Sequence, residues 1–348
     1  AADNVVFLSK YRSRSSFPDP YLIYFDGYSL GRISVDGCER IEDTLQDEWG
    51  RGLVRSWRNE CIGLPEHVGD LLAPVIGASP GEVLLTDQTS VNLFKLATAA
   101  LEATGRTDIV ADDSNFPSDL YVLDAVARAA GGRLRIAPTD RMSGPTVDCL
   151  APLLDEHVGV VSLSHVGFKS GALANLSTIT AAAHDAGART LWDLSHSAGV
   201  VPVGLNAHHV DLAVGCTYKY LNGGPGAPAF LYVRRDLQEH LTTPIPGWFG
   251  HDNMFAFDPT YSPAPGIRRF AAGTPPILSL RGAQAGITLS AEAGIEAIRT
   301  KSVELTELLI ARYDTSLAEL GFELGSPRET DRRGGHVSLI HPHAYQIT

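Results

Sequence analysis

Seven short apolar runs alternate with segments of helical periodicity, and this alternation constrains the fold more than any other feature of the chain. The clearest helical segments, 91–103, 118–130 and 178–186, repeat apolar residues every three or four positions. Strands and helices in alternation predict an α/β fold, in which helices cover both faces of a mostly parallel sheet. The predicted strands are residues 82–86, 108–111, 133–137, 159–164, 190–192, 210–214 and 229–233.

Polar side chains directly follow several of these strands, and α/β sheets bind ligands beyond the carboxyl ends of their strands. Thr89 and Ser90 follow the first strand and open a helix, where free backbone N–H groups can bind a phosphate. The same two residues also suit a plain helix cap. Phe116 and Asp119, after the second strand, place an aromatic ring and a carboxylate three residues apart.

Two further strand ends carry groups suited to chemistry. Asp193 ends the fifth strand, with His196 three residues on, and it either caps the following helix or binds a ligand cation. Lys219 follows the sixth strand, between two tyrosines and ahead of a glycine-rich turn. A lysine there is either a nucleophile able to form a Schiff base or a surface residue whose charged end reaches water.

These groups together match one cofactor, pyridoxal 5'-phosphate. It requires a lysine for its aldehyde, a carboxylate for its pyridinium nitrogen, an aromatic ring to stack on and a helix N-terminus for its phosphate. The sequence therefore predicts a pyridoxal phosphate enzyme in which Lys219 is the nucleophile.

Charge and cysteine content argue against several other classes of protein. The net charge is -12 and no lysine or arginine cluster forms a basic face, so nucleic acid is not an expected partner. The four cysteines are widely spaced, which indicates reduced thiols in the cytoplasm rather than disulfides or a zinc site. No metal-ligand spacing appears, and His208 and His209 indicate a solvated turn. No apolar run reaches the roughly 20 residues of a membrane span, and the N-terminus lacks the profile of a signal peptide.

A set of segments, in order along the chain, carries a resemblance to a known family. They are residues 24–31, 48–57, 89–95, 116–119, 192–199, 215–226, 247–251, 267–270 and 275–278. Over nearly its whole length the chain resembles the kynureninases, fold-type-I pyridoxal phosphate enzymes of aminotransferase class V. The segments around Asp193 and Lys219 are more similar to kynureninases than to cysteine desulfurases. The expected domains are an N-terminal segment at 1–60, a large α/β cofactor-binding domain at 61–255 and a smaller α+β domain at 256–348.

The resemblance implies a role for each residue around the cofactor ring. Lys219 is expected to bind the cofactor and to carry the α-proton of the substrate. Tyr218 is expected to bind the phosphate and assist proton transfer. Asp193 is expected to pair with the pyridinium nitrogen, with Asp119 as a second carboxylate nearby, while Phe116 stacks on the ring.

The resemblance also implies how the cofactor's polar ends are held. Thr89 and Ser90 are expected to bind the phosphate, and His196 to lie near the polar edge of the ring. The family builds its site across a homodimer interface, so Trp248 and the turn of Gly273 and Thr274 are expected to reach the partner's phosphate. Core packing and a simple turn are the alternatives for these last positions.

The implied activity is the hydrolysis of L-kynurenine or 3-hydroxykynurenine in tryptophan catabolism. The products are anthranilate or 3-hydroxyanthranilate, together with L-alanine. In the family an arginine that grips the substrate's α-carboxylate lies beyond the position of Thr348, so the C-terminal domain is expected to be truncated here. Arg332 and Arg333 are the nearest candidates, but they resemble a loop that precedes a strand.

Some positions on the expected substrate side depart from the family. Tyr28 stands where asparagine is usual, and residues 167–170 read Gly-Phe-Lys-Ser in place of Asn-Tyr-Arg-Thr. Residues 59–63 lack a tryptophan common in bacterial members. Three hypotheses follow: a working kynureninase whose sequence is clipped, a pyridoxal phosphate lyase or hydrolase for another amino acid or a modified kynurenine, or an inactive cofactor-binding homologue. The complete set of candidate catalytic residues argues against the last.

Overall fold

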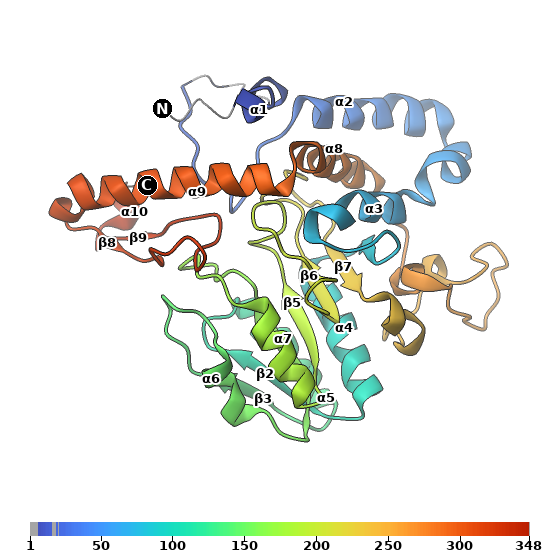
Figure 1. The fold of residues 1–348 in the computed structure, drawn as a ribbon. Coiled ribbons are helices and arrows are strands. Elements are labelled where there is room, and N and C mark those ends of the chain that lie inside the picture. The colour runs from blue at the N-terminus through green and yellow to red at the C-terminus, as the bar shows by residue number, and fades with distance from the viewer. Residues whose placement is uncertain (1–5, 16–18, 20, 348) are drawn as a thin grey trace.

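The structure is a computed structural model that describes residues 6–15, 19 and 21–347. Within these residues seven strands form one sheet, and each overlaps a strand predicted from the sequence (Figure 1). The expectation about a signal peptide concerns the N-terminus, and residues 1–5 lie outside the described residues. The strands are β1 Val83–Leu85, β2 Asp108–Asp112, β3 Leu134–Ala137, β4 Val158–Ser164, β5 Arg189–Asp193, β6 Leu212–Gly215 and β7 Phe230–Val233.

The sheet is mostly parallel, as predicted, and its strand order is β1-β7-β6-β5-β4-β2-β3. Among these strands β7 alone runs antiparallel to its neighbours, β6 and β1, so the others all point the same way. Their carboxyl ends therefore meet at one edge. The register pairs Asp193 with Ser164 of β4 and Val214 of β6, which puts Asp193 at the centre of that edge.

Helices cover both faces of the sheet (Figure 1), and α4, α5 and α7 overlap the three helical segments predicted from periodicity. The helices are α1 Val6–Ser9, α2 Val35–Asp43, α3 Leu64–Ile76, α4 Thr89–Thr104, α5 Pro117–Ala129, α6 Val147–Leu150, α7 Leu176–Asp185, α8 Ile277–Ala293, α9 Ile295–Arg312 and α10 Ala344–Ile347. Successive strand residues point to opposite faces. In β5, Leu191 packs in a buried cluster with α4 and α5, whereas Trp192 packs with α3, α7 and α8 on the other side.

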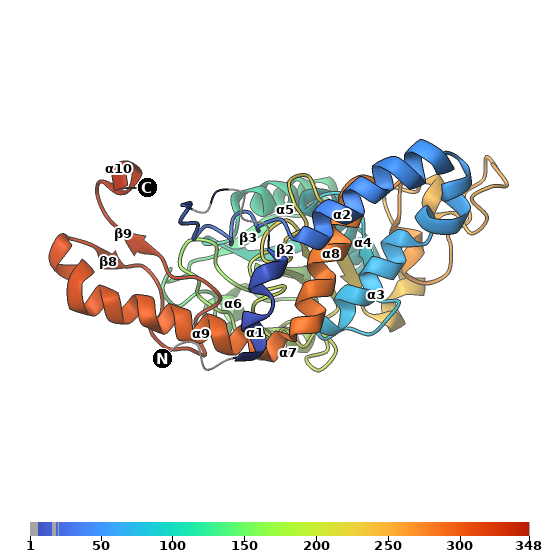
Figure 2. The ribbon, with the colours of Figure 1, turned by 90° about the horizontal axis from the view of Figure 1, so that it is seen from above.

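The C-terminal part extends away from the sheet. Helix α9 leads to a hairpin of β8 Glu323–Leu324 and β9 Leu339–Ile340, which lies beside α9 in both views (Figures 1 and 2). Helix α8 packs against both α2 and α3, so the three expected domains contact one another. Their division at residues 60 and 255 stays a prediction.

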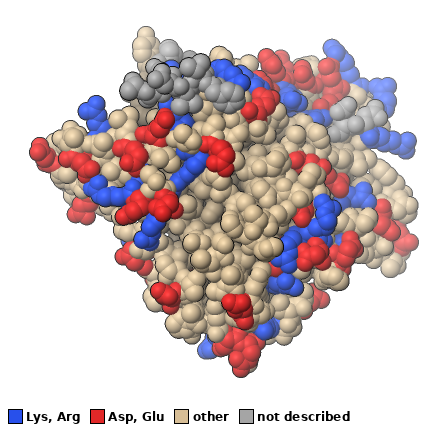
Figure 3. Space-filling view, viewed as in Figure 1, with Lys and Arg blue, Asp and Glu red and all other residues tan. Residues whose placement is uncertain are grey.

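The surface carries charges of both signs. On the face in Figure 3, lysines and arginines lie among aspartates and glutamates and do not gather into a basic stripe. In the part of the chain that the structure describes, no helix combines the length and the apolar character needed to cross a bilayer. The four cysteines form no disulfide among the described residues.

Candidate active site

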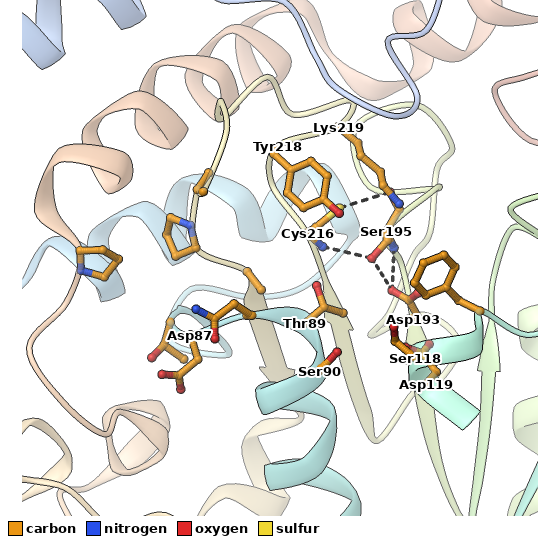
Figure 4. A pocket seen from close by; sticks show the side chains of 18 of the residues that line it. Asp87, Thr89, Ser90, Ser118, Asp119, Asp193, Ser195, Cys216, Tyr218 and Lys219 are labelled. Atoms are coloured by element: carbon orange, nitrogen blue, oxygen red, sulfur yellow. Dashed lines mark hydrogen bonds between the residues drawn. The ribbon is translucent and has the colours of Figure 1, made fainter. Parts of the chain in front are cut away.

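A cavity of about 600 Å³ opens at the carboxyl edge of the sheet. Its walls come from the segments that follow β1, β2, β5 and β6, together with a turn at residues 273–276. In Figure 4, Lys219 and Tyr218 face the start of α4 and the aspartates at the end of β5 and the start of α5. The predicted residues that line this cavity are Thr89, Ser90, Phe116, Asp119, Asp193, His196, Tyr218, Lys219 and Thr274.

The N-terminus of α4 forms one end of the cavity and is suited to an anion. Gln88 precedes the helix in an extended conformation, and its side chain makes no capping hydrogen bond. The first backbone N–H groups of a helix have no acceptor within it, so those of Thr89 and Ser90 can donate to a ligand. A phosphate bound here would gain these hydrogen bonds and the favourable field of the helix dipole.

An ion pair between a buried lysine and a partly exposed aspartate, which the sequence analysis did not assign, holds the loop before α4. Asp87 has a left-handed backbone with φ of 49°, which is uncommon for a residue with a side chain. Lys95 on α4 is wholly buried and donates to Asp87 at 2.8 Å and to the carbonyl oxygen of Phe270. Burial lowers the pKa of Lys95. The pair therefore fixes the loop that leads into the anion-binding end of the cavity.

Two buried carboxyl groups, Asp193 and Asp119, lie on another side of the cavity (Figure 4). Asp193 accepts hydrogen bonds from the backbone N–H and the hydroxyl of Ser195, at 2.9 and 2.6 Å. Burial raises the pKa of both carboxyl groups, and the charge of Asp193 raises that of Asp119 further. Among the described residues neither carboxyl group forms an ion pair, although the charge of Lys219 acts to lower the pKa of both. A ligand cation bound here would stabilise their ionised forms.

Lys219 lies between these two ends. Its Nζ is 3.1 Å from Nε2 of His196. The same atom is 5.9 Å from the ring centre of Phe116 and 5.8 Å from that of Tyr218. Burial, and then the charge of Lys219, lower the pKa of His196 to about 3, so the imidazole is neutral at neutral pH. The backbone around Lys219 is crowded, because a Cβ on Gly31 would lie 2.1 Å from the Lys219 carbonyl oxygen.

One backbone contact and one ring contact hold Phe116 in place. Oδ1 of Asn115 accepts hydrogen bonds from the Phe116 N–H at 2.8 Å and from the hydroxyl of Ser164 at 2.7 Å. Phe168 meets the ring edge-on, with centroids 5.1 Å apart and planes at 84°. Phe116 is 38% exposed and lines the cavity, so a fixed aromatic face is available to a flat ligand.

The Tyr218 hydroxyl stays protonated in this setting. Burial raises the pKa of its hydroxyl to about 12, and the neighbouring Cys216 acts in the same direction. The hydroxyl therefore keeps its proton at neutral pH.

Trp248, unlike the other predicted residues, is not among those lining this cavity. Its ring packs with Trp57 and Phe249, at centroid distances of 6.1 and 5.1 Å. Thr274 lines the cavity of its own chain. The expectation that Trp248 and Thr274 serve the partner's site stays a prediction.

Arg332 and Arg333, the candidates for binding the substrate's carboxylate, also lie away from this cavity. Arg333 is almost wholly buried, pairs with Glu307 and donates to the Pro327 carbonyl at 2.9 Å. Arg332 donates to the Ser143 carbonyl at 3.3 Å. Both arginines stabilise the loop that precedes β9.

Sequence reasoning missed several supporting residues. Ser195 orients Asp193, and the spacing Asp-x-Ser after a strand is a turn signal that could have revealed it. Asn115 and Phe168 act through contacts between distant segments, and so does the bond from Lys95 to the Phe270 carbonyl. The sequence gives no local signal for these contacts.

These observations fit pyridoxal phosphate. The site offers helix N–H groups for a phosphate and a fixed aromatic face for the ring. It also offers the carboxyl groups of Asp119 and Asp193 for a protonated ring nitrogen, since neither forms an ion pair among the described residues. Lys219 lies where it can reach the cofactor's aldehyde from the same cavity.

Comparison with known proteins gives a consistent result. The aminotransferase class-V family model matches residues 53–343. The kynureninase of Pseudomonas fluorescens is 40% identical, over 98% of this chain and 82% of its own length. The kynureninase of Burkholderia pseudomallei (strain K96243) is 41% identical, over 94% of this chain and 79% of its own length.

Solved structures share the fold. The apo cysteine desulfurase from Thermococcus onnurineus NA1 is 24% identical with a TM-score of 0.78, over 96% of this chain and 85% of that one. A C-DES mutant with glycine covalently linked to its PLP cofactor is 19% identical with a TM-score of 0.82, over 95% of this chain and 88% of that one. At these identities the likeness shows the architecture alone.

Proposed function

The chain belongs to the kynureninase family within aminotransferase class V, and from this membership we propose that it hydrolyses L-kynurenine or 3-hydroxykynurenine. Pyridoxal phosphate is the cofactor, and the products are anthranilate or 3-hydroxyanthranilate and L-alanine. The observation that carries the proposal is 40% identity to a kynureninase over 98% of the chain. The pathway that we propose for this reaction is tryptophan catabolism.

We propose the following roles for the residues that hold the cofactor. When bound, pyridoxal phosphate supplies an electron sink for the carbon atoms next to the substrate's amine. The N–H and hydroxyl groups of Thr89 and Ser90 bind the phosphate. Phe116 stacks on the ring, and Asp193 holds a proton on the ring nitrogen, which its buried negative charge stabilises.

Lys219 and Tyr218 move protons in this proposal. Nζ of Lys219 binds the cofactor and, when released, takes the proton from the substrate's α-carbon. Tyr218 donates from its hydroxyl, which keeps its proton because its pKa is about 12. One water molecule adds to the γ-carbonyl carbon and the bond between the β- and γ-carbons breaks. The water's oxygen enters the anthranilate carboxylate, and a proton is added to the β-carbon of alanine.

We also propose that the chain acts as a homodimer in the cytoplasm. A helical turn at Thr44–Gly52 and the residues after it expose Trp49, Leu53 and Val54, at 61, 62 and 75%. These side chains line an apolar hollow of about 360 Å³ that also includes Trp57. Exposed apolar patches mark protein contacts, and a twofold dimer buries the same patch of both subunits. Among the described residues the widely separated cysteines form no disulfide, which suits a reducing compartment.

Replacing Trp49 with aspartate is expected to weaken the dimer by about 30-fold or more, because losing one large aromatic side chain at the centre of an interface costs about 2 kcal/mol or more. Analytical ultracentrifugation would measure the dissociation constant. Leu320→Asp is the matched control, since Leu320 is similarly exposed at 65% but lies between α9 and β8. An unchanged dissociation constant for Trp49→Asp would place the interface elsewhere.

The proposed activity is tested by supplying the purified protein with cofactor and each of the two kynurenines, and following the aryl amine product. Turnover of at least one compound is expected. Visible cofactor absorbance without turnover of either compound would indicate a relative that acts on another amino acid. Absence of that absorbance would contradict the cofactor assignment.

A further inference from the structure

Three rings from distant parts of the chain meet beside Lys219. Tyr28 precedes α2, His196 follows β5, and His336 precedes β9. The rings of Tyr28 and His336 are stacked, with centroids 4.9 Å apart and planes 12° from parallel. The His196 ring lies 6.4 Å from that of Tyr28 and 5.9 Å from that of His336, tilted by 43° and 54°.

Ring contacts and a single hydrogen bond hold the His196 side chain. Among the described residues its ring makes one hydrogen bond, to Nζ of Lys219 at 3.1 Å. An imidazole held by a single hydrogen bond can change its rotamer unless neighbouring groups block the rotation. His196 is 7% exposed, and the stacked rings of Tyr28 and His336 occupy the space next to it.

Charge does not hold this cluster together. Burial, as the largest cause, lowers the pKa of His196 to about 3 and that of His336 to about 4, so both rings are neutral at neutral pH. Burial likewise raises the pKa of Tyr28, which keeps its proton. The three rings therefore interact as flat, uncharged surfaces, for which shape decides the contact.

We propose that the stacked pair of Tyr28 and His336 positions His196, and through it the Nζ of Lys219. This inference rests on the proposed function, because it takes Lys219 as the residue that binds pyridoxal phosphate. Tyr28 and His336 are positioning residues: neither is among the residues that line the cavity, whereas His196 and Lys219 both line it.

The test compares variants that keep a ring with variants that keep only its bulk. Tyr28→Leu and His336→Leu remove the flat ring, whereas Tyr28→Phe and His336→Phe retain it. The rate at which the apoprotein binds pyridoxal phosphate covalently, followed by visible absorbance, reports directly on Lys219. In the leucine variants we expect this rate and kcat to fall by about tenfold, near the most that one aromatic pair contributes, with KM unchanged. The phenylalanine variants are expected to match the wild type.

Phe322→Leu is the matched control. Phe322 makes a similar contact with His341, at 4.7 Å and 38°, next to the β8–β9 hairpin and away from the cavity. Its loss is expected to leave cofactor binding unchanged even if thermal stability falls. Leucine variants at both positions that bind the cofactor at the wild-type rate would overturn the inference. Wild-type apoprotein that binds no cofactor would instead overturn the proposed function.

Discussion

Replacing Lys219 with alanine is expected to reduce turnover by about 10⁴-fold, because the variant loses the amine that we propose both attaches the cofactor covalently and acts as the base for the α-proton. The lysine lies in the same cavity as the carboxyl group of Asp193, the ring of Phe116 and the N-terminus of α4. Among the described residues that line this cavity there is no second lysine, so no other side-chain amine can replace it. The visible absorbance of the lysine-bound cofactor should disappear in the same variant.

Two measurements separate this loss from unfolding. Far-ultraviolet circular dichroism and thermal melting should show that Lys219→Ala keeps the fold, because removing a side chain that faces a cavity leaves the core intact. Lys301→Ala, which removes a lysine on α9 far along the chain, should keep full activity and absorbance. If Lys219→Ala retained even a tenth of the wild-type turnover, Lys219 would not be the nucleophile.

Replacing Asp193 with asparagine is expected to lower kcat by about 10²- to 10³-fold, the range typical of losing one preorganised electrostatic contact. The amide keeps the shape of the carboxylate and can still accept the 2.9 Å hydrogen bond from the Ser195 N–H. It loses the negative charge that we propose stabilises a proton on the cofactor's ring nitrogen. Stopped-flow kinetics should place the loss in kcat rather than in KM, because the charge acts on the reaction and not on substrate binding.

The control for this substitution is Asp113→Asn. Asp113 also follows a strand, but it is exposed and its Oδ1 accepts hydrogen bonds from Thr139 outside the cavity. Its replacement should leave the kinetics unchanged. A wild-type kcat for Asp193→Asn would remove this residue from the proposed catalytic set.

The strands and the position of the site could be predicted because both depend on local pattern. A run such as 159–164 is apolar over a strand's length, and β4 covers it as Val158–Ser164. Parallel strands bring their carboxyl ends to one edge, so residues that directly follow them converge without further information. Lys219 and Asp193 line one cavity for that reason.

The supporting contacts could not be predicted because they join segments with no shared local signal. Tyr28 and His336 lie at opposite ends of the chain, and their stacking depends on how α8, α9 and the hairpin fold back. The family pattern, without any local signal, is the basis for expecting Tyr28 on the substrate side of the pocket. Similarly, the left-handed backbone of Asp87 is stabilised by Lys95 eight residues later, whose burial no periodicity reveals.

The central claim is that this chain hydrolyses a carbon–carbon bond of kynurenine, and turnover in H₂¹⁸O tests it most directly. Mass spectrometry should find anthranilate and L-alanine in equal amounts from L-kynurenine, or 3-hydroxyanthranilate and L-alanine from the hydroxylated substrate. The aryl acid should carry solvent oxygen in its carboxylate, because water attacks the γ-carbonyl carbon. Failure to form the aryl acid from either substrate, or an aryl acid without solvent oxygen, would contradict the claim.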